Sequence, residues 1–148
     1  MKDHGVLHPQ LARVLAETGH TDLVGLCDAG LPVPAGVERV DLAFAPGEPA
    51  LLDVLDAVLE ELRVEGYVLA SETAEQAPWL VTALAERLPE AAVTWVDHAG
   101  LKMRSAGARA IVRTGEVRPF ANVLLVSGVD FDALAGEPLR RRSRSAGR

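Results

Sequence analysis

The chain has 148 residues, of which 49% are hydrophobic, and a net charge of −6 at pH 7. This length fits one domain with a single core, and no apolar run reaches the roughly 18 residues that a membrane-spanning helix needs. The last ten residues hold five arginines and no acidic residue, so the rest of the chain has 10 basic against 21 acidic groups, a net charge of −11. Such a body repels a phosphate backbone, which disfavours nucleic acid as a partner. We expect one folded domain over residues 1–138 and a basic, disordered tail over residues 139–148.

The only cysteine, Cys27, excludes an intrachain disulfide. It lies within an apolar run, which is typical of a core residue rather than a reactive thiol. The first four residues lead into a polar helix signal and not into the apolar core of a signal peptide. We therefore expect a soluble, cytoplasmic protein with no membrane partner.

Apolar residues along the chain alternate between helical spacing and short strand-like runs. In chain order, the pattern predicts a helix over 9–16, strands over 23–27 and 37–44, a helix over 51–62, a strand over 67–70, a helix over 74–88 whose longer part starts at Pro78, a strand over 93–96, a short helix over 100–105, and strands over 110–113 and 123–126. Such alternation favours a three-layer α/β/α fold with a mixed, partly parallel sheet of about six strands.

Ligands of such sheets bind beyond the carboxyl ends of strands, so polar residues beside strand ends are the candidates. Asp28 directly follows the strand over 23–27, where its carboxylate can orient His20 or accept ligand hydroxyls; an Asx turn is the alternative. His98 follows the strand over 93–96, with the same two interpretations.

His20 lies between the first helix and the first strand. Because an imidazole has an unperturbed pKa of about 6.5, it can donate and accept a proton at neutral pH. An interaction with the dipole of the preceding helix is the alternative. Lys102 can meet a hydroxyl or a phosphate, or be solvated. Asn122 offers a donor and an acceptor, or is an ordinary turn residue.

No cofactor signature is present. The chain has neither a GxGxxG nor a GxxxxGK[ST] pattern, which removes the usual support for nucleotide binding. Its four histidines lack the paired spacing of zinc ligands. We expect no metal and no cofactor.

Two separated segments resemble the D-ribose pyranase family. Residues 5–34, GVLHPQLARVLAETGHTDLVGLCDAGLPVP, are similar to the family's amino-terminal signature, with its GHTD and CDAGLP segments. Residues 110–129, AIVRTGEVRPFANVLLVSGV, resemble its carboxyl-terminal pattern. The likeness spans roughly residues 3–131, and two matches in the right order are more specific than either one alone.

The resemblance implies cofactor-independent interconversion of the pyranose and furanose forms of D-ribose, with His20 as the proton donor. It assigns the sugar contacts to Asp28, His98, Phe120, Ala121 and Asn122. Where the family usually has tyrosine, this chain has Phe120. Phenylalanine keeps the ring but lacks the hydroxyl, so a hydrogen bond or proton transfer assigned to that hydroxyl cannot occur here.

The resemblance also implies a homo-oligomer, a decamer of two five-membered rings with pockets between neighbouring subunits. His20 and Asn122 of one pocket would then come from different chains. Two alternatives remain open. One is a mutarotase that acts on fucose or another monosaccharide; the other is a noncatalytic sugar-binding module, which Phe120 and the arginine tail favour.

Overall fold

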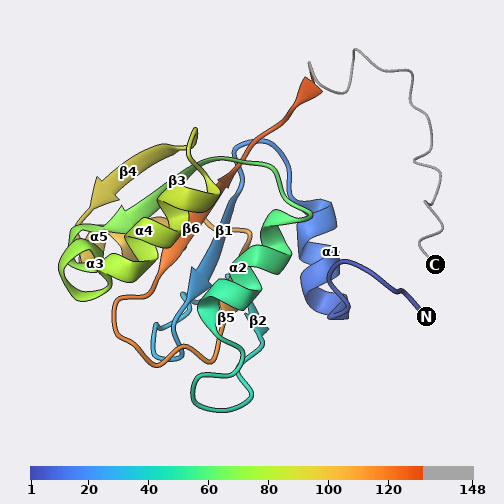
Figure 1. Cartoon of the computed structure of the whole chain (residues 1–148), viewed down its shortest axis with the longest axis horizontal. Helices are drawn as coiled ribbons and strands as arrows, with labels where there is room; N and C mark the ends of the chain where they lie inside the picture. Colours follow the sequence, from blue (N-terminus) through green and yellow to red (C-terminus); the bar gives the residue numbers. More distant parts are fainter. Residues whose placement is uncertain (132–148) are drawn as a thin grey trace.

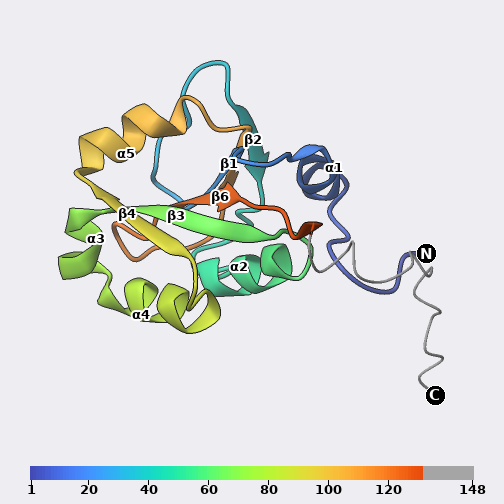
Figure 2. The same cartoon turned by 90° about the horizontal axis from the view of Figure 1, so that it is seen from above.

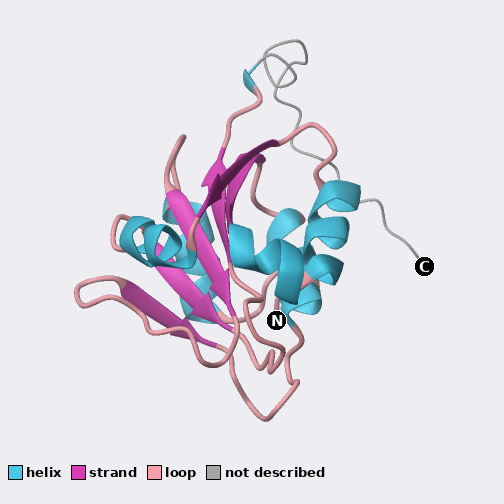
Figure 3. Ribbon diagram, turned by 90° about the vertical axis from the view of Figure 1, so that its left-hand side faces the viewer, coloured by secondary structure: helices cyan, strands magenta, loops and turns pink. Residues whose placement is uncertain are grey.

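The computed structural model describes residues 1–131, which form a six-stranded sheet with helices packed on it (Figures 1 and 3). The elements in chain order are α1 (Pro9–Glu17), β1 (Leu23–Cys27), β2 (Glu38–Asp41), α2 (Leu51–Leu59), β3 (Val64–Ala70), α3 (Ser71–Gln76), α4 (Pro78–Arg87), β4 (Ala92–Val96), α5 (His98–Ser105), β5 (Ala110–Arg113) and β6 (Val123–Ser127). None of the helices in this part of the chain is both long and apolar enough to cross a bilayer. The tail predicted over residues 139–148 lies outside the described residues.

The sheet is mixed, as predicted, with the strand order β2-β5-β1-β6-β3-β4. Strand β6 is antiparallel to both of its neighbours, β1 and β3, whereas the other neighbouring pairs are parallel. The other five strands therefore all run in one direction. As a result, β6 begins at the edge of the sheet where the other strands end.

Helices cover both faces of the sheet, and Figure 2 shows α5 on one side with α2 and α4 on the other. The larger buried cluster joins the sheet to α1, α2 and α4, and it includes Leu55, Leu80 and Leu125. The smaller cluster joins the opposite face to α5 through Leu101 and Ile111. Full burial of each such side chain contributes about 1.5–3 kcal/mol. The predicted three-layer α/β/α fold is thus confirmed.

Element boundaries differ from the prediction where a local feature interrupts the periodicity. The segment predicted as one helix over 74–88 is two helices, α3 and α4. Pro78 occupies the first turn of α4, where its missing N–H costs no helical hydrogen bond. Strand β3 starts at Val64 and not at residue 67, because an irregularity at Glu65 breaks the strand alternation. Helix α5 starts at His98 and not at residue 100, because the Asp97 carboxylate accepts a hydrogen bond of 2.6 Å from Gly100 N–H and caps the helix.

Candidate functional site

A cavity of about 530 Å³ opens at the edge where the parallel strands end. The loop after β1, helix α5 and the loop between β5 and β6 line it. The predicted site residues in its lining are Asp28, His98, Lys102, Phe120 and Asn122. The topology explains how they meet, because the antiparallel β6 brings the residue before it to the end of β1. The remaining residue of the predicted tripeptide, Ala121, is fully buried in the larger core cluster.

Asp28 and Asn122 hold each other through two hydrogen bonds. Asn122 Nδ2 donates to Asp28 Oδ2 at 3.2 Å, and Asp28 N–H donates to Asn122 Oδ1 at 3.0 Å. Asp28 Oδ1 also accepts from the N–H groups of Gly30 and Leu31, each at 3.0 Å. The Asx turn that the sequence offered as an alternative is therefore present together with the position in the cavity lining. A carboxylate has about four lone-pair sites, so this fixed group can still accept ligand hydroxyls.

His98 and Phe120 form an aromatic corner of the cavity. Their ring centroids are 5.1 Å apart with an interplanar angle of 72°, an edge-to-face arrangement. His98 Nδ1 is buried and has no hydrogen-bond partner among the described residues. A buried polar atom without a partner destabilises the free protein, and a ligand hydroxyl can relieve that cost. Lys102 lies one turn further along α5, on the same helical face, and is exposed.

Phe120 has a left-handed backbone conformation, with φ of 58°. This region is sparsely populated by bulky residues, so the surrounding structure must hold it. The buried Thr73 hydroxyl of α3 donates to the Phe120 carbonyl at 2.9 Å. Helix α3 thus contributes to the orientation of the residue that precedes Ala121 and Asn122.

A charge pair supports the loop before Phe120, and the sequence analysis missed it. Arg118 donates from Nε and Nη2 to the two carboxylate oxygens of Glu116, at 2.8 and 2.9 Å, and its guanidinium lies 3.5 Å from the centroid of the Trp79 ring. Hydrogen bonding to Arg118 is the main cause that lowers the pKa of the buried Glu116 to about 2, with a smaller contribution from the Leu51 N–H at the start of α2. The available signal was a pair of opposite charges two residues apart in a loop with Gly115 and Pro119.

His20 lies at the opposite edge of the sheet from this cavity. It precedes β1 whereas Asp28 follows it, and a five-residue strand spans roughly 15 Å. The His20 side chain is 48% exposed, and its Nε2 is 2.9 Å from Oε2 of Glu65. Within one chain, therefore, the carboxylate beside His20 belongs to Glu65 and not to Asp28.

The sequence also raised the questions of a reactive thiol at Cys27 and of a metal site. Burial is the main cause that raises the pKa of the Cys27 thiol to about 12, so this cysteine is protonated at neutral pH and behaves as a core residue. Within residues 1–131, no three His, Cys, Asp or Glu side chains converge in the way that a metal site needs. The cavity offers hydrogen-bonding groups and one flanking lysine, which suits a small polar ligand.

A cavity of this kind, at the carboxyl edge of a mixed α/β sheet, is typical of small-molecule sites. The model of the RbsD / FucU transport protein family matches residues 1–130, and the chain belongs to that family. Curated relatives named D-ribose pyranase, from Laribacter hongkongensis and Streptomyces avermitilis, are 49% and 51% identical to it over 131 residues, which is 88% of this chain and 100% of theirs. The family predicted from the GHTD and CDAGLP segments is thus confirmed.

Solved structures agree with this assignment. The structure of Bacillus subtilis RbsD complexed with D-ribose is 40% identical in sequence and superposes with a TM-score of 0.85, over 88% of this chain and 100% of that one. The fucose mutarotase of Streptococcus pneumoniae in complex with L-fucose is 23% identical, with a TM-score of 0.70 over 87% and 99% of the two chains. At that identity it shows a shared fold.

Proposed function

We propose that this chain interconverts the pyranose and furanose forms of D-ribose by acid/base-assisted ring opening, without a cofactor. One observation carries the proposal. Asp28, His98 and Asn122 line a single cavity in a chain that is 40% identical, with a TM-score of 0.85, to a protein whose structure holds D-ribose. The D-ribose pyranases at 49% and 51% identity support the same activity.

The reaction breaks and re-forms one C–O bond, and the catalyst need only supply and remove protons. The anomeric hydroxyl loses its proton, the ring oxygen gains one, and the bond between the anomeric carbon and the ring oxygen breaks to give the open-chain aldehyde. The furanose forms when a different hydroxyl adds to that carbonyl carbon and loses its proton, while the carbonyl oxygen gains a proton and becomes the new anomeric hydroxyl. Protons and electrons balance over the cycle, and a positioned acid/base group typically contributes about 10²–10⁴-fold.

In this proposal the cavity residues bind and orient the sugar. The Asp28 carboxylate and the Asn122 amide provide fixed acceptors and a donor, and the unpartnered His98 Nδ1 provides another polar contact. Lys102 supplies an exposed ammonium group at the rim, and Phe120 an apolar wall. His20 donates the proton to the ring oxygen.

His20 can reach a sugar only if a second copy of the chain brings it to the cavity. In its own chain it lies beyond the opposite end of β1. We therefore propose a homo-oligomer with pockets between subunits, in the decamer of two five-membered rings that the family resemblance implies. Exposed apolar side chains beside the cavity support a covering subunit, since Val117 is 62% exposed and Phe44 is 85% exposed. The same proposal places the reaction in the cytoplasm, which suits the free Cys27.

Saturation-transfer NMR on D-ribose tests the activity directly. We expect the wild-type protein to accelerate pyranose–furanose exchange and His20→Ala to lower that acceleration by about 10²–10⁴-fold, the usual contribution of an acid/base group. His4→Ala is the matched control, because His4 is exposed and pairs only with its neighbour Asp3 among the contacts described. Unchanged exchange with wild-type protein rejects the activity, and full activity in His20→Ala rejects the role of that residue.

Phe120 supports a second candidate function, that of a mutarotase for fucose or another monosaccharide. The missing tyrosine hydroxyl leaves the choice of sugar less determined. The same NMR measurement on L-fucose and D-ribose separates the two, because the physiological class of sugar should show the larger acceleration. Saturable ribose binding without accelerated exchange would instead indicate a noncatalytic sugar-binding module.

A further inference from the structure

We propose that Glu65 is the positioning residue of His20. Its carboxylate accepts a hydrogen bond from His20 Nε2 and thereby leaves Nδ1 to exchange the proton with the sugar. The inference rests on the function proposed above, but its structural part concerns only this pair. The proposal is based on the 2.9 Å distance between His20 Nε2 and Glu65 Oε2, two residues that are 45 positions apart in the sequence.

Glu65 is placed by an irregularity in strand β3. In the ladder between β3 and β6, Val64 pairs with Ser127 and Gly66 pairs with Val126, so Glu65 has no partner residue opposite it. A bulged residue of this kind leaves the regular alternation of the strand, and bulges commonly re-aim a side chain beside a functional site. The bulge therefore provides a structural reason for the direction of the Glu65 side chain.

The space that Glu65 occupies depends on Gly128. A Cβ atom at position 128 would lie 2.9 Å from Glu65 Cβ and 3.3 Å from Glu65 Oε2. The first of these distances is shorter than normal Cβ contacts, so a side chain there would displace Glu65. The Gly128 N–H also donates to Arg63 O at 2.9 Å, which fixes the end of β6 against the start of β3.

The loop that carries His20 is held on the same frame. Thr21 N–H donates to Ser127 O at 2.8 Å, and Ser127 N–H donates to Asp22 O at 2.9 Å. Thr21 has a left-handed backbone, with φ of 69°, which is rare for a β-branched residue and must be imposed by these contacts. His20 and Glu65 thus extend from two segments that the exit of β6 ties together.

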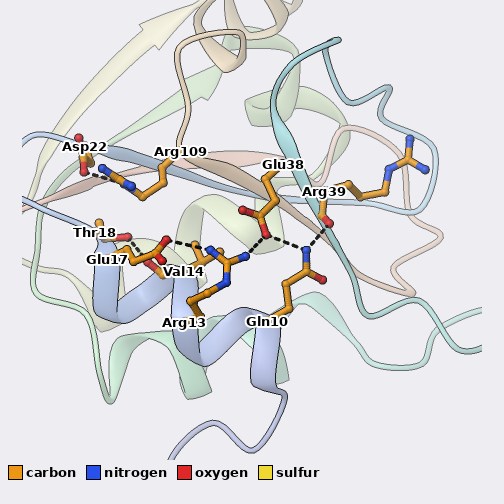
Figure 4. Close-up of polar contacts among 9 residues, drawn as sticks. All are labelled: Gln10, Arg13, Val14, Glu17, Thr18, Asp22, Glu38, Arg39 and Arg109. Atoms are coloured by element: carbon orange, nitrogen blue, oxygen red, sulfur yellow. Dashed lines mark hydrogen bonds and ion pairs between the residues drawn. The ribbon is translucent and has the colours of Figure 1, made fainter.

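The other carboxylate near His20, Asp22, is engaged elsewhere. Asp22 Oδ2 accepts hydrogen bonds from Gly19 N–H at 2.8 Å and from Arg109 Nε at 2.9 Å, and Figure 4 shows the Asp22–Arg109 contact. The Gly19 hydrogen bond is the largest of the causes that lower the pKa of Asp22. Asp22 therefore holds the loop, and Glu65 is the carboxylate that contacts the imidazole.

The pairing has a defined chemical consequence. A carboxylate at Nε2 selects the tautomer with its proton on that nitrogen, so in the neutral ring Nδ1 is the free acceptor. In the protonated ring Nδ1 becomes a donor, and Glu65 holds the ring orientation through Nε2, as a carboxylate does for the histidine of a catalytic triad. In the isolated chain both side chains are about half exposed, at 48% and 46%. A covering subunit would reduce the solvent screening between them.

Two separate measurements test the proposal, one of the His20 tautomer and one of the rate of ribose exchange. Imidazole ¹⁵N shifts of His20, measured in the assembled protein, should show the Nε2–H tautomer in the wild type. In Glu65→Gln the amide can donate to Nε2 instead of accepting from it, so we expect the Nε2–H fraction to fall. The turnover number for ribose exchange should fall about 10–10²-fold with KM within about twofold, because the affected group transfers protons. Glu65→Asp, which keeps a carboxylate on a shorter side chain, should retain more of the rate.

Glu60→Gln is the matched control, because it removes a charge from an exposed glutamate at the end of α2. It should leave both the tautomer and the rate at the wild-type level. Gly128→Ala is a second test variant, since it displaces the Glu65 side chain without removing it. We expect it, too, to lower the turnover number. An unchanged tautomer in Glu65→Gln, an unchanged turnover number, or an effect confined to KM would each overturn the inference. If wild-type protein accelerated no exchange, the function would fail on its own, while the ¹⁵N shifts would still decide whether Glu65 sets the tautomer.

Discussion

The rings of Phe120 and His98 pack edge-to-face, at the position where the family pattern that this chain resembles was expected to carry tyrosine. We expect Phe120→Tyr to improve sugar binding, because one additional hydrogen bond contributes about 0.5–1.5 kcal/mol net, which corresponds to a fall in KM of about 2–10-fold. The turnover number should stay within about twofold, since His20 is the proposed proton donor. Exchange NMR over a range of ribose concentrations separates the two constants. A higher turnover number at constant KM would assign proton transfer to the new hydroxyl.

Glu116 gives the fold a predictable pH dependence. Its folded-state pKa of about 2 lies below the ordinary value of 4.5, so its ionised form stabilises the fold above about pH 4.5, and this contribution is lost as the pH falls through about 2. We expect Glu116→Gln to lower the free energy of unfolding at pH 7 by about 1–2 kcal/mol, a value reduced for the solvent screening of the half-exposed Arg118. Urea unfolding at pH 7 and pH 3 measures this, and the difference from wild type should shrink at the lower pH. A difference that is the same at both pH values would attribute the effect to packing.

At the scale of elements, α3 is linked to the lining of the cavity through one hydroxyl, that of Thr73. Thr73→Val removes the hydrogen bond to the Phe120 carbonyl at nearly constant shape, and so frees the strained backbone beside Asn122. We expect KM for ribose to rise about 3–10-fold, the equivalent of one lost hydrogen bond, with a smaller change in turnover number. Thr73→Ser, which keeps the hydroxyl, should behave like wild type in the same NMR assay. If the serine variant were equally impaired, the methyl group and not the hydrogen bond would be responsible.

The helices and strands were predictable because hydrophobic periodicity is local, and so was the cavity edge, because Asp28 and His98 each follow a strand. Two kinds of feature could not be predicted from the sequence. The antiparallel β6 and the bulge at Glu65 depend on which strands pair, and periodicity along one strand carries no such information. Contacts such as Arg118 with Trp79 join residues 39 positions apart, and neither residue type alone indicates a partner.

At the scale of the whole molecule, the central fact is that His20 and its own cavity lie at opposite edges of one sheet. The family resemblance implies that both belong to one site with parts from different chains, whereas spacing along a chain alone carries no information on which copy supplies each part. A five-residue strand spans roughly 15 Å, which is longer than a histidine side chain can reach. An interface that joins one edge to the opposite edge of the next copy is heterologous, and it closes into a ring only when the rotation between copies closes, as the proposed five-membered rings require.

This arrangement predicts complementation between inactive variants. His20→Ala removes the donor and leaves the cavity intact, whereas His98→Ala alters the cavity and leaves the donor intact, so each alone should be impaired in ribose exchange. Co-expressed at equal levels with two different affinity tags, they should form mixed assemblies in which about one site in four combines an intact donor with an intact cavity. Exchange NMR on the doubly purified assembly should then recover activity in that proportion. The two proteins mixed after separate purification serve as the control without subunit exchange.

Native mass spectrometry shows whether mixed assemblies form. If they form but recover no activity, His20 and His98 of each site come from the same chain. The geometry of the single chain would then have to change on assembly to bring them together, because nothing in its present fold spans the length of β1.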